Sequence, residues 1–255
     1  MNKILFIAMM ATLALADIGR VTVVKGDASV ERDVKILKAH NEMGLLKQDI
    51  VETAQGRLQM YFNDKTVISL GRESRFVIKE YLYEENSEQV AATFKLEKGF
   101  VKTITGAIGK IMPDLFVLET STTKMTPHGT IWSAEVNDES EIYKVLEGRV
   151  TLVYNDGLDR KVELLAGETA LLKKAKDGSV KSFKKSKITN SDMRSRYENS
   201  LEQNLAIVNE EKDRNLIRDT IPSNTGETVN DPIDEGDVIE EEVHDNRDGE
   251  KTPKG

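Results

Sequence analysis

Residues 56–70 read GRLQMYFNDKTVISL, and this stretch decides the fold class. Leu58, Met60 and Phe62 alternate with polar neighbours, which is the period-two pattern of a strand that buries one face. The polar run at 63–65 interrupts the alternation, and a second β-rich run follows at 67–70. This order predicts a strand, a tight turn and a second strand.

The same pattern continues on both sides of that hairpin. Alternating apolar residues predict strands around Val21 and Val30. The run at 150–154 leads into Asn-Asp-Gly and then into a second β-rich run at 162–165, and another Asp-Gly lies at 177–178. An Asp-Gly between two such runs indicates a hairpin, because glycine accepts the positive φ of the turn. The prolines are expected to lie outside the alternating runs, since proline cannot donate to a strand ladder.

An internal similarity links several strand starts. Residues 19–24 read GRVTVV and residues 148–153 read GRVTLV, with weaker versions beginning at Gly56 and Gly99. Each copy is expected to place its glycine in a tight turn just before a strand. The spacings are too irregular for a solenoid, and chance similarity remains an open alternative. We therefore expect an all-β domain over 17–187, either a β-sandwich or a short irregular β-roll.

The two ends of the chain differ from this β region. Lys3, the apolar run at 4–13 and Ala14-Leu15-Ala16 predict a signal peptide over 1–16, with an uncleaved anchor as the alternative. Capping residues and an apolar stripe predict an amphipathic helix over 188–219, either packed on the domain or available for docking. Its stripe consists of Met193, Tyr197, Leu201, Leu205 and Val208. Residues 220–255 are acidic and poor in aromatic residues, which predicts a disordered tail.

Charge and cysteine content limit the classes of function. Residues 221–255 carry eleven acidic and three basic side chains, which accounts for the whole net charge of −8. The rest of the chain is balanced, so no basic patch indicates a nucleic-acid partner. The tail lacks the ordered spacing of a calcium loop. The absence of cysteine excludes disulfides, and an exported chain must then be stabilised by its core.

Several separated motifs resemble the FecR domain family. They are LKQDIVET at 46–53, the hairpin at 56–70, FVLET at 116–120 with GTIW at 129–132, YKVLEGRV at 143–150 and LAGE at 165–168. The resemblance covers about residues 21–172. The chain departs from the family pattern at Gln48 and Lys65, where the family usually has glycine, and at His128, where it usually has arginine.

The resemblance implies a domain that works in the bacterial envelope. Family members that regulate sigma factors place a cytoplasmic segment and a transmembrane helix before this domain. Here a signal peptide is expected to lead into the domain instead, which disfavours transmembrane anti-sigma signalling by this chain alone.

No residues are predicted to be catalytic, cofactor-binding or metal-binding. His40, His128 and His244 are far apart in sequence, and His128 is expected to be a loop residue bonded to backbone. The run GAIGK at 106–110 has the wrong length for a phosphate loop and is expected to be a glycine-rich turn. Trp132 is expected in the core, with a ligand-stacking face as the alternative. A hydrolase with an unmarked carboxylate pair is the weakest hypothesis.

The sequence therefore favours a non-enzymatic, exported FecR-like binding or signalling module. It is expected to be periplasmic or secreted, without a stable membrane anchor after cleavage, and to recognise an envelope protein or ligand. The alternative is a secreted or cell-wall-associated protein that binds polysaccharide or has a structural role.

Processing after Ala16 is the first testable prediction, because the apolar run is short and ends at small residues. Intact mass spectrometry of the natively expressed protein should give a mature chain that starts at Asp17. A mature chain that retains Met1 or Asn2 would instead identify the segment as an anchor.

Overall fold

The computed structural model describes residues 16–85, 87, 89–154 and 160–189. Within them the chain is predominantly β, which confirms the predicted class. The predicted signal peptide, helix and acidic tail lie outside the described residues, apart from a few residues at their boundaries. The elements are β1 (Gly19–Lys25), β2 (Ala28–Arg32), β3 (Lys35–Lys38), β4 (Gly44–Leu45), β5 (Ile50–Thr53), β6 (Arg57–Phe62), β7 (Val67–Leu70), β8 (Arg75–Leu82), β9 (Ala91–Ile104), α1 (Ala107–Ile111), the 3-10 turn η1 (Pro113–Leu115), β10 (Phe116–Glu119), β11 (Thr123–Val136), β12 (Ser140–Tyr154), β13 (Arg160–Leu165), β14 (Glu168–Lys174) and β15 (Val180–Lys187).

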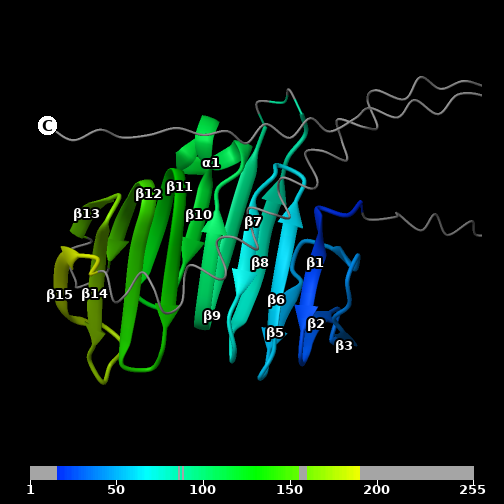
Figure 1. Ribbon diagram of the computed structural model, residues 1–255, viewed down its shortest axis with the longest axis horizontal. Coiled ribbons are helices and arrows are strands. Elements are labelled where there is room, and N and C mark those ends of the chain that lie inside the picture. Colours follow the sequence, from blue (N-terminus) through cyan, green and yellow to red (C-terminus); the bar gives the residue numbers. More distant parts are fainter. Residues whose placement is uncertain (1–15, 86, 88, 155–159, 190–255) are drawn as a thin grey trace, which may run out of the picture. The chain divides into compact units, whose positions relative to one another are not determined.

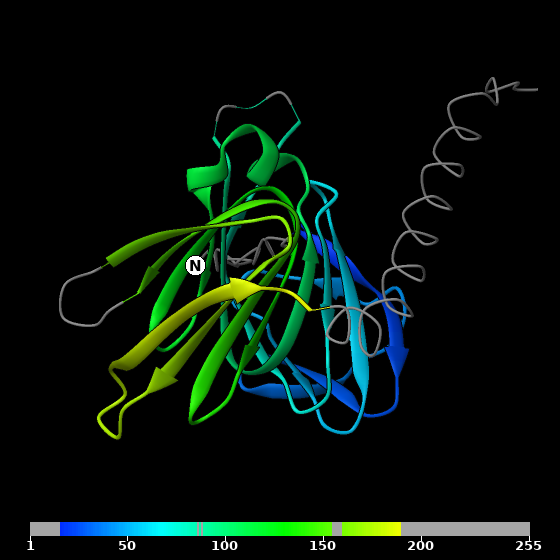
Figure 2. The same ribbon diagram turned by 60° about the vertical axis from the view of Figure 1, so that its left-hand side comes forward.

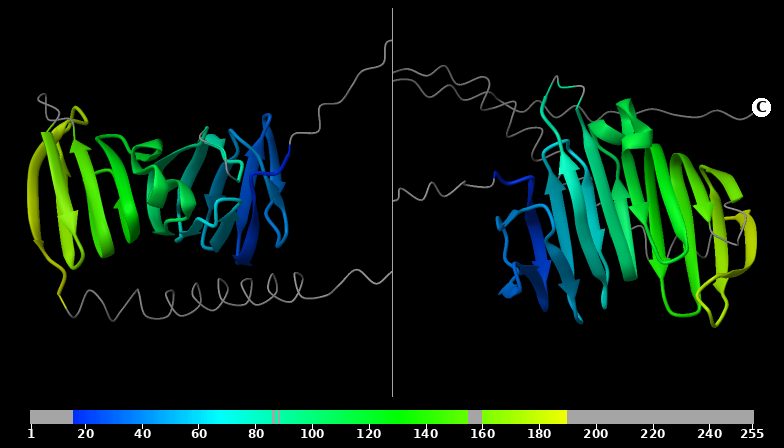
Figure 3. Two further views of the ribbon diagram at one scale, coloured as in Figure 1. Left: turned by 90° about the horizontal axis from the view of Figure 1, so that it is seen from above. Right: turned by 180° about the vertical axis from the view of Figure 1, so that it is seen from behind.

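All of these strands belong to one hydrogen-bonded sheet, and three long strands, β9, β11 and β12, connect its two parts (Figure 1). The first half-sheet runs β3-β2-β5-β8-β9-β10-β11-β12-β13 and uses the first part of β9, the first part of β11 and the last part of β12. The second half-sheet runs β4-β1-β6-β7-β9-β11-β12-β14-β15 and uses the remaining parts. Both views of Figure 3 show the colours passing from blue at one end of the sheet to yellow at the other, so the N-terminal and C-terminal strands of the domain lie at opposite ends.

Each long strand changes its buried face where it passes between the half-sheets. In β12, Glu141, Tyr143 and Val145 are buried, and after Gly148 the buried positions become Val150 and Leu152. The same change of parity occurs in β9 and in β11. Because a strand's side chains alternate with period two, a one-residue shift is needed to keep one apolar face inside while the strand turns a corner. Figure 2 shows the long green strands, β11 and β12, curving along their length.

The corners coincide with glycines at positive φ. These are Gly99 at 93°, Gly129 at 61° and Gly148 at 75°. The expectation that Gly99 and Gly148 stand in turns before strands was therefore wrong, since both lie inside long strands. Gly99 and Gly148 share a left-handed backbone conformation, which glycine adopts without a Cβ penalty, whereas Gly19 and Gly56 do not have a positive φ.

One core lies between the half-sheets. Phe62 of the second half-sheet has its ring centroid 5.2 Å from Phe94 and 5.3 Å from Tyr81 of the first. Phe76 and Phe116 extend this aromatic cluster, and α1 adds Ile108 at its end. Either a β-sandwich or a short irregular β-roll was expected. The strand pairings describe one continuous sheet, and its two half-sheets supply the two layers around the core.

The predicted hairpins are confirmed by the strand registers. Leu58 pairs with Leu70, Tyr154 pairs with Arg160, and β14 pairs with β15 around a turn where Gly178 has φ 85°. One expectation was wrong, because Pro127 lies within β11. At Pro127, β11 pairs with β12 on one side only. On its other side, the pairing with β10 has already ended and the pairing with β9 has not yet begun. The N–H that proline lacks is therefore not needed for a strand pairing on that side.

Two departures from the family pattern also have a backbone consequence. Gln48 has φ 70° and Lys65 has φ 69°, so both positions adopt the left-handed conformation that glycine favours. The hairpin at Lys65 nevertheless closes, with its amide donating to Phe62 O at 2.9 Å.

The corner at Gly148 should be sensitive to a single methyl group. A Cβ there would lie 2.4 Å from Gly129 O, whereas a Cβ on Gly167, with a similar φ of 79°, would meet nothing within 4 Å. We expect Gly148→Ala to lower the free energy of unfolding by about 2–4 kcal/mol and Gly167→Ala by about 1 kcal/mol, because only the first adds a steric clash to the backbone strain. Urea denaturation measures both, and equal losses would contradict the corner geometry.

Candidate interaction site

The structure first settles where the residues singled out by the sequence lie. Trp132 is in β11 with 1% of its surface exposed and belongs to the core cluster, so it cannot serve as an exposed stacking face. Its Nε1 and the neighbouring Thr103 Oγ1 are buried without a hydrogen-bond partner among the described residues. His128 lies in β11 rather than in a loop, and its Nε2 is 3.1 Å from Thr151 Oγ1 rather than bonded to backbone. Burial and the nearby Arg149 lower the pKa of His128.

The run at 106–110 was wrongly expected to be a turn, because Ala107–Ile111 form α1. The helix begins there because Asp64 satisfies its first amides. Ala107 N donates to Asp64 O at 2.7 Å, and Ile108 N donates to Asp64 Oδ2 at 3.3 Å. Asp64 is fully buried and also accepts hydrogen bonds from Tyr81 Oη and Thr66 Oγ1. Its carboxylate therefore stabilises the β6–β7 turn and the start of α1 together.

Asp49, in the family-like motif at 46–53, is a second fully buried carboxylate. Arg32 Nε donates to its Oδ1 at 2.8 Å and Arg32 Nη2 to its Oδ2 at 2.6 Å, which is the bidentate geometry of a strong pair. Leu46 N donates to the same carboxylate at 2.8 Å, and Arg32 Nη2 also reaches Gly44 O. The pair thus ties β2 to the loop before β5.

Glu141 is a third fully buried carboxylate, surrounded by hydroxyl groups. It accepts hydrogen bonds from Thr120, Ser121, Thr123 and Tyr143 at 2.7–3.0 Å, and Lys174 Nζ lies 3.2 Å away. Burial acts to raise the pKa of Glu141, but the hydroxyl donors and Lys174 together hold that pKa below its usual value. The carboxylate fixes the β10–β11 turn to β12 and β14.

These carboxylates do not form the pair that a hydrolase would need. Each carboxylate accepts hydrogen bonds from side chains and backbone amides of the domain itself. Its oxygens therefore stabilise the fold. Within residues 16–189, apart from the undescribed gaps, no group of three His, Asp or Glu side chains is placed to hold a metal ion. No helix among the described residues is long and apolar enough to cross a membrane.

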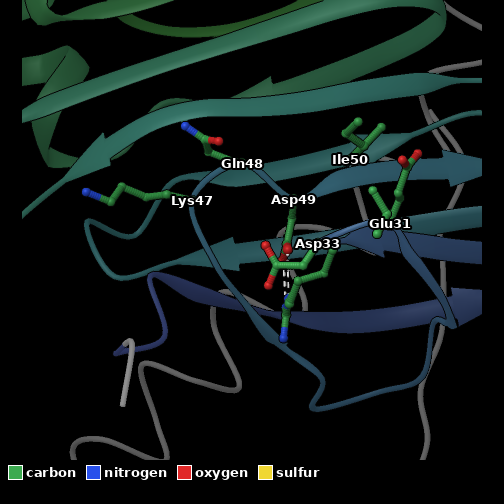
Figure 4. A pocket seen from close by; sticks show the side chains of 8 residues that line it. Glu31, Asp33, Lys47, Gln48, Asp49 and Ile50 are labelled. Carbon is green, nitrogen blue, oxygen red and sulfur yellow. Dashed lines mark hydrogen bonds and ion pairs between the residues drawn. The ribbon is translucent and has the colours of Figure 1, made fainter. Parts of the chain in front are cut away.

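A small pocket of about 210 Å³ lies beside the Arg32–Asp49 pair (Figure 4). Lys47 and Gln48 lie on one side of it, and Glu31 and Ile50 on the other. Pockets for small-molecule ligands usually measure 300–1,000 Å³ and are mostly apolar. This pocket is smaller and charged, so it does not have the usual character of a small-molecule site.

The β2–β3 hairpin next to this pocket is the most exposed apolar feature. Val34 is 94% exposed and Ile36 is 75% exposed. Every residue of β3 is exposed, and among the described strands β3 pairs with β2 alone, so no described strand occupies its other edge. The turn is unusual as well: Asp33 has φ 47° and Val34 has φ 61°, a conformation that is uncommon for a β-branched residue.

Residues 49–151 match the family model described as FecR protein. The resemblance to the FecR family that the sequence motifs indicated is therefore confirmed for this part of the chain. The match begins at the buried Asp49 and includes the aromatic cluster and all three glycine corners. The match to the FecR family supports the interpretation of the chain as a signalling or regulatory module.

Two crystal structures of a "putative anti-sigma factor" from Parabacteroides distasonis, at 2.50 Å and 1.65 Å resolution, are similar to the chain, each with 16% identity and a TM-score of 0.41. They cover 53% and 54% of this chain, which in turn covers 57% and 59% of theirs, so it spans less than two thirds of that protein. No curated protein matches the chain.

Sequence reasoning missed the hairpin at 28–38 as a feature of the surface. The signal was present, because Val34, Ile36 and Leu37 are apolar residues crowded into a short lysine-flanked run. Only the strand pairings show that this run forms an edge rather than an inner strand.

The Arg32–Asp49 pair can be tested by its effect on stability. Arg32→Met should lower the free energy of unfolding by about 2–4 kcal/mol, because it leaves a fully buried carboxylate without its cation. Arg75→Met is the matched control: it removes contacts with Glu52 and Glu97, whose side chains are more than one third exposed, and should cost about 1 kcal/mol or less. Chemical denaturation followed by Trp132 fluorescence would give both values. A loss for Arg32→Met no larger than the control's would refute the assigned role.

Proposed function

We propose that this chain is a non-enzymatic, exported binding module that recognises a protein of the bacterial envelope through the edge strand β3. The observation that carries the proposal is the exposed apolar hairpin at 28–38, next to the start of the FecR domain. Its place of action, the periplasm or the cell exterior, rests on the N-terminal sequence.

An exposed, apolar edge strand is unusual unless something binds it. Natural sheets protect their edges with charges, prolines or bulges, because free N–H and C=O groups pair readily with other strands. An edge strand of the second half-sheet, β15, has lysines at 181, 184, 185 and 187. In contrast, β3 places Ile36 and Leu37 at its centre. A partner segment could add as a further strand, with main-chain hydrogen bonds for affinity and apolar side chains for specificity.

The charges on this edge select the kind of partner. Lys35 and Lys38 flank the apolar centre of β3. In antiparallel pairing of two copies, these lysines would face each other, and like charges directly opposite destabilise a strand pair. An extended segment with apolar residues and flanking carboxylates fits better. The adjacent Lys47 offers a further contact for an acidic side chain.

The polysaccharide alternative has less support. Sugars bind well to exposed aromatic faces, and the single tryptophan, Trp132, is buried in the core. The FecR domain supports regulation, which also favours a protein partner.

Site-specific photocrosslinking in the native envelope tests the proposed edge. A photoreactive residue at Ile36 should capture one specific envelope protein, and the same residue at Lys181 on the other edge should not. Adding Val34→Lys to the Ile36 probe should reduce capture about tenfold or more, because a buried charge would be placed in the contact.

Equal capture at both positions, or capture unaffected by Val34→Lys, would rule out β3 as the docking edge. Retention of the purified protein on peptidoglycan, without any crosslinked protein, would favour the polysaccharide alternative.

A further inference from the structure

The outer face of the second half-sheet, opposite the core, has an ordered arrangement of side chains. A row of directly paired polar residues crosses it, and we call this surface the Lys102 face. The row consists of Gln59, Ser69, Lys102, Ser133, Lys144, Thr169 and Ser186. Mostly apolar rows flank it on both sides: Val67, Ile104 and Ile131 on one, and Phe100, Glu135, Ile142 and Leu171 on the other, where Glu135 is the one charged residue.

The outer face of the first half-sheet is different in kind. It carries exposed ion pairs, such as Arg75 with Glu52 and Glu97, and Lys79 with Glu119. Their side chains are between about one fifth and one half exposed, as expected for a face in contact with water. The two outer faces therefore have different environments.

The part of the Lys102 face that lies on β6, β7, β9 and β11 contains buried side chains although it points away from the core. Lys102 and Val67 are 1% exposed, Ser133 is 2% exposed and Gln59 is 5% exposed. Val67 is absent from the core cluster, in keeping with its outward direction. The main contacts among the described elements are between neighbouring strands and with α1 and η1, and Ile108 of α1 belongs to the core. A long side chain such as lysine on an open sheet face normally reaches water, so this face requires a cover.

We propose that residues 190–206 form an amphipathic helix that lies across the Lys102 face. The described chain ends beside that face: β15 pairs with β14 at the edge of the second half-sheet, and Ile188 N donates to Gly167 O at 2.8 Å. The next residues carry the apolar stripe of Met193, Tyr197, Leu201 and Leu205. The inference is independent of the function proposed for β3.

The dimensions of the segment and of the face agree. A helix of these residues is about 25 Å long at 1.5 Å per residue. The five steps from β14 through β12, β11, β9 and β7 to β6 span about 24 Å at the usual spacing of strands. One helix perpendicular to the strands would therefore cover the row from Thr169 to Gln59.

The chemistry of the two surfaces is complementary as well. The stripe offers apolar side chains to the two flanking apolar rows. Glu198 and Glu202, each next to a stripe residue, bring carboxylates toward the face that holds Lys102 and Lys144. Burial lowers the pKa of Lys102 to about 8, so the ammonium benefits from a nearby carboxylate.

Lysine labelling in the full chain tests the cover. An amine-reactive ester at about pH 8 should modify Lys102 at least tenfold more slowly than Lys124, whose side chain is 70% exposed. The variant Tyr197→Ser/Leu201→Ser should abolish that protection, because it removes the apolar contacts. The control Asn199→Ser/Gln203→Ser changes the opposite face of the predicted helix and should keep it. Unchanged emission from Trp132 verifies that the domain stays folded.

A second measurement does not depend on destabilising the segment. The chain has no cysteine, so Ser133→Cys with Tyr197→Cys creates a unique pair. A short bis-maleimide should link this pair within one molecule, and should not link Lys95→Cys with Tyr197→Cys on the other outer face.

Three results would overturn the proposal. They are rapid labelling of Lys102 in the parent chain, protection that survives in the stripe variant, and protection that disappears on dilution. The last would assign the cover to a second copy of the chain.

Discussion

The fold depends on one constraint: three long strands must pass between half-sheets while keeping the same face of the sheet in the core. A strand's side chains alternate strictly, so a corner without a one-residue shift would turn Tyr143 or Leu152 toward water. Gly99, Gly129 and Gly148 provide the shift through positive φ values. The packing at Gly148 leaves no space for a Cβ beside Gly129 O, so neighbouring corners also constrain each other. The single core and its aromatic cluster follow from these three positions.

Three buried carboxylates stabilise loops and turns that connect the strands. Asp49, Asp64 and Glu141 each have their oxygens occupied by donors from a loop and from a neighbouring strand. A buried charge is costly unless it is paired, so each carboxylate selects one loop conformation and penalises the others. Acidic positions that a reader of the sequence could take for chemistry serve here to fix turns and the start of α1.

The surfaces are what remain for function, and they are not alike. One outer face carries exposed ion pairs, whereas the Lys102 face is mostly apolar on its flanks and partly buried. The edge strand β15 carries four lysines, whereas the edge strand β3 has an apolar centre and follows a strained turn. The buried carboxylates are occupied by donors of the domain itself, so the binding that we propose would use such edges and faces.

The sequence alone determined the β class, the hairpins at 56–70 and 150–165, the hairpin turn at Asp177-Gly178 and the similarity to the FecR family, because alternation and turn residues are local signals. Lys65 and Gln48 stand where glycine was expected, and their positive φ values show that those positions were aligned correctly. The corner role of Gly148, the helical form of 107–111 and the strand position of His128 came only from the structure. Each depends on partners far away in sequence: Gly129 for the corner, Asp64 for α1 and Thr151 for His128. The exposure of Ile36 and the burial of Lys102 could not be predicted from the sequence for the same reason. A residue's exposure depends on which strands lie beside it and on what covers it, and a local sequence pattern contains neither kind of information.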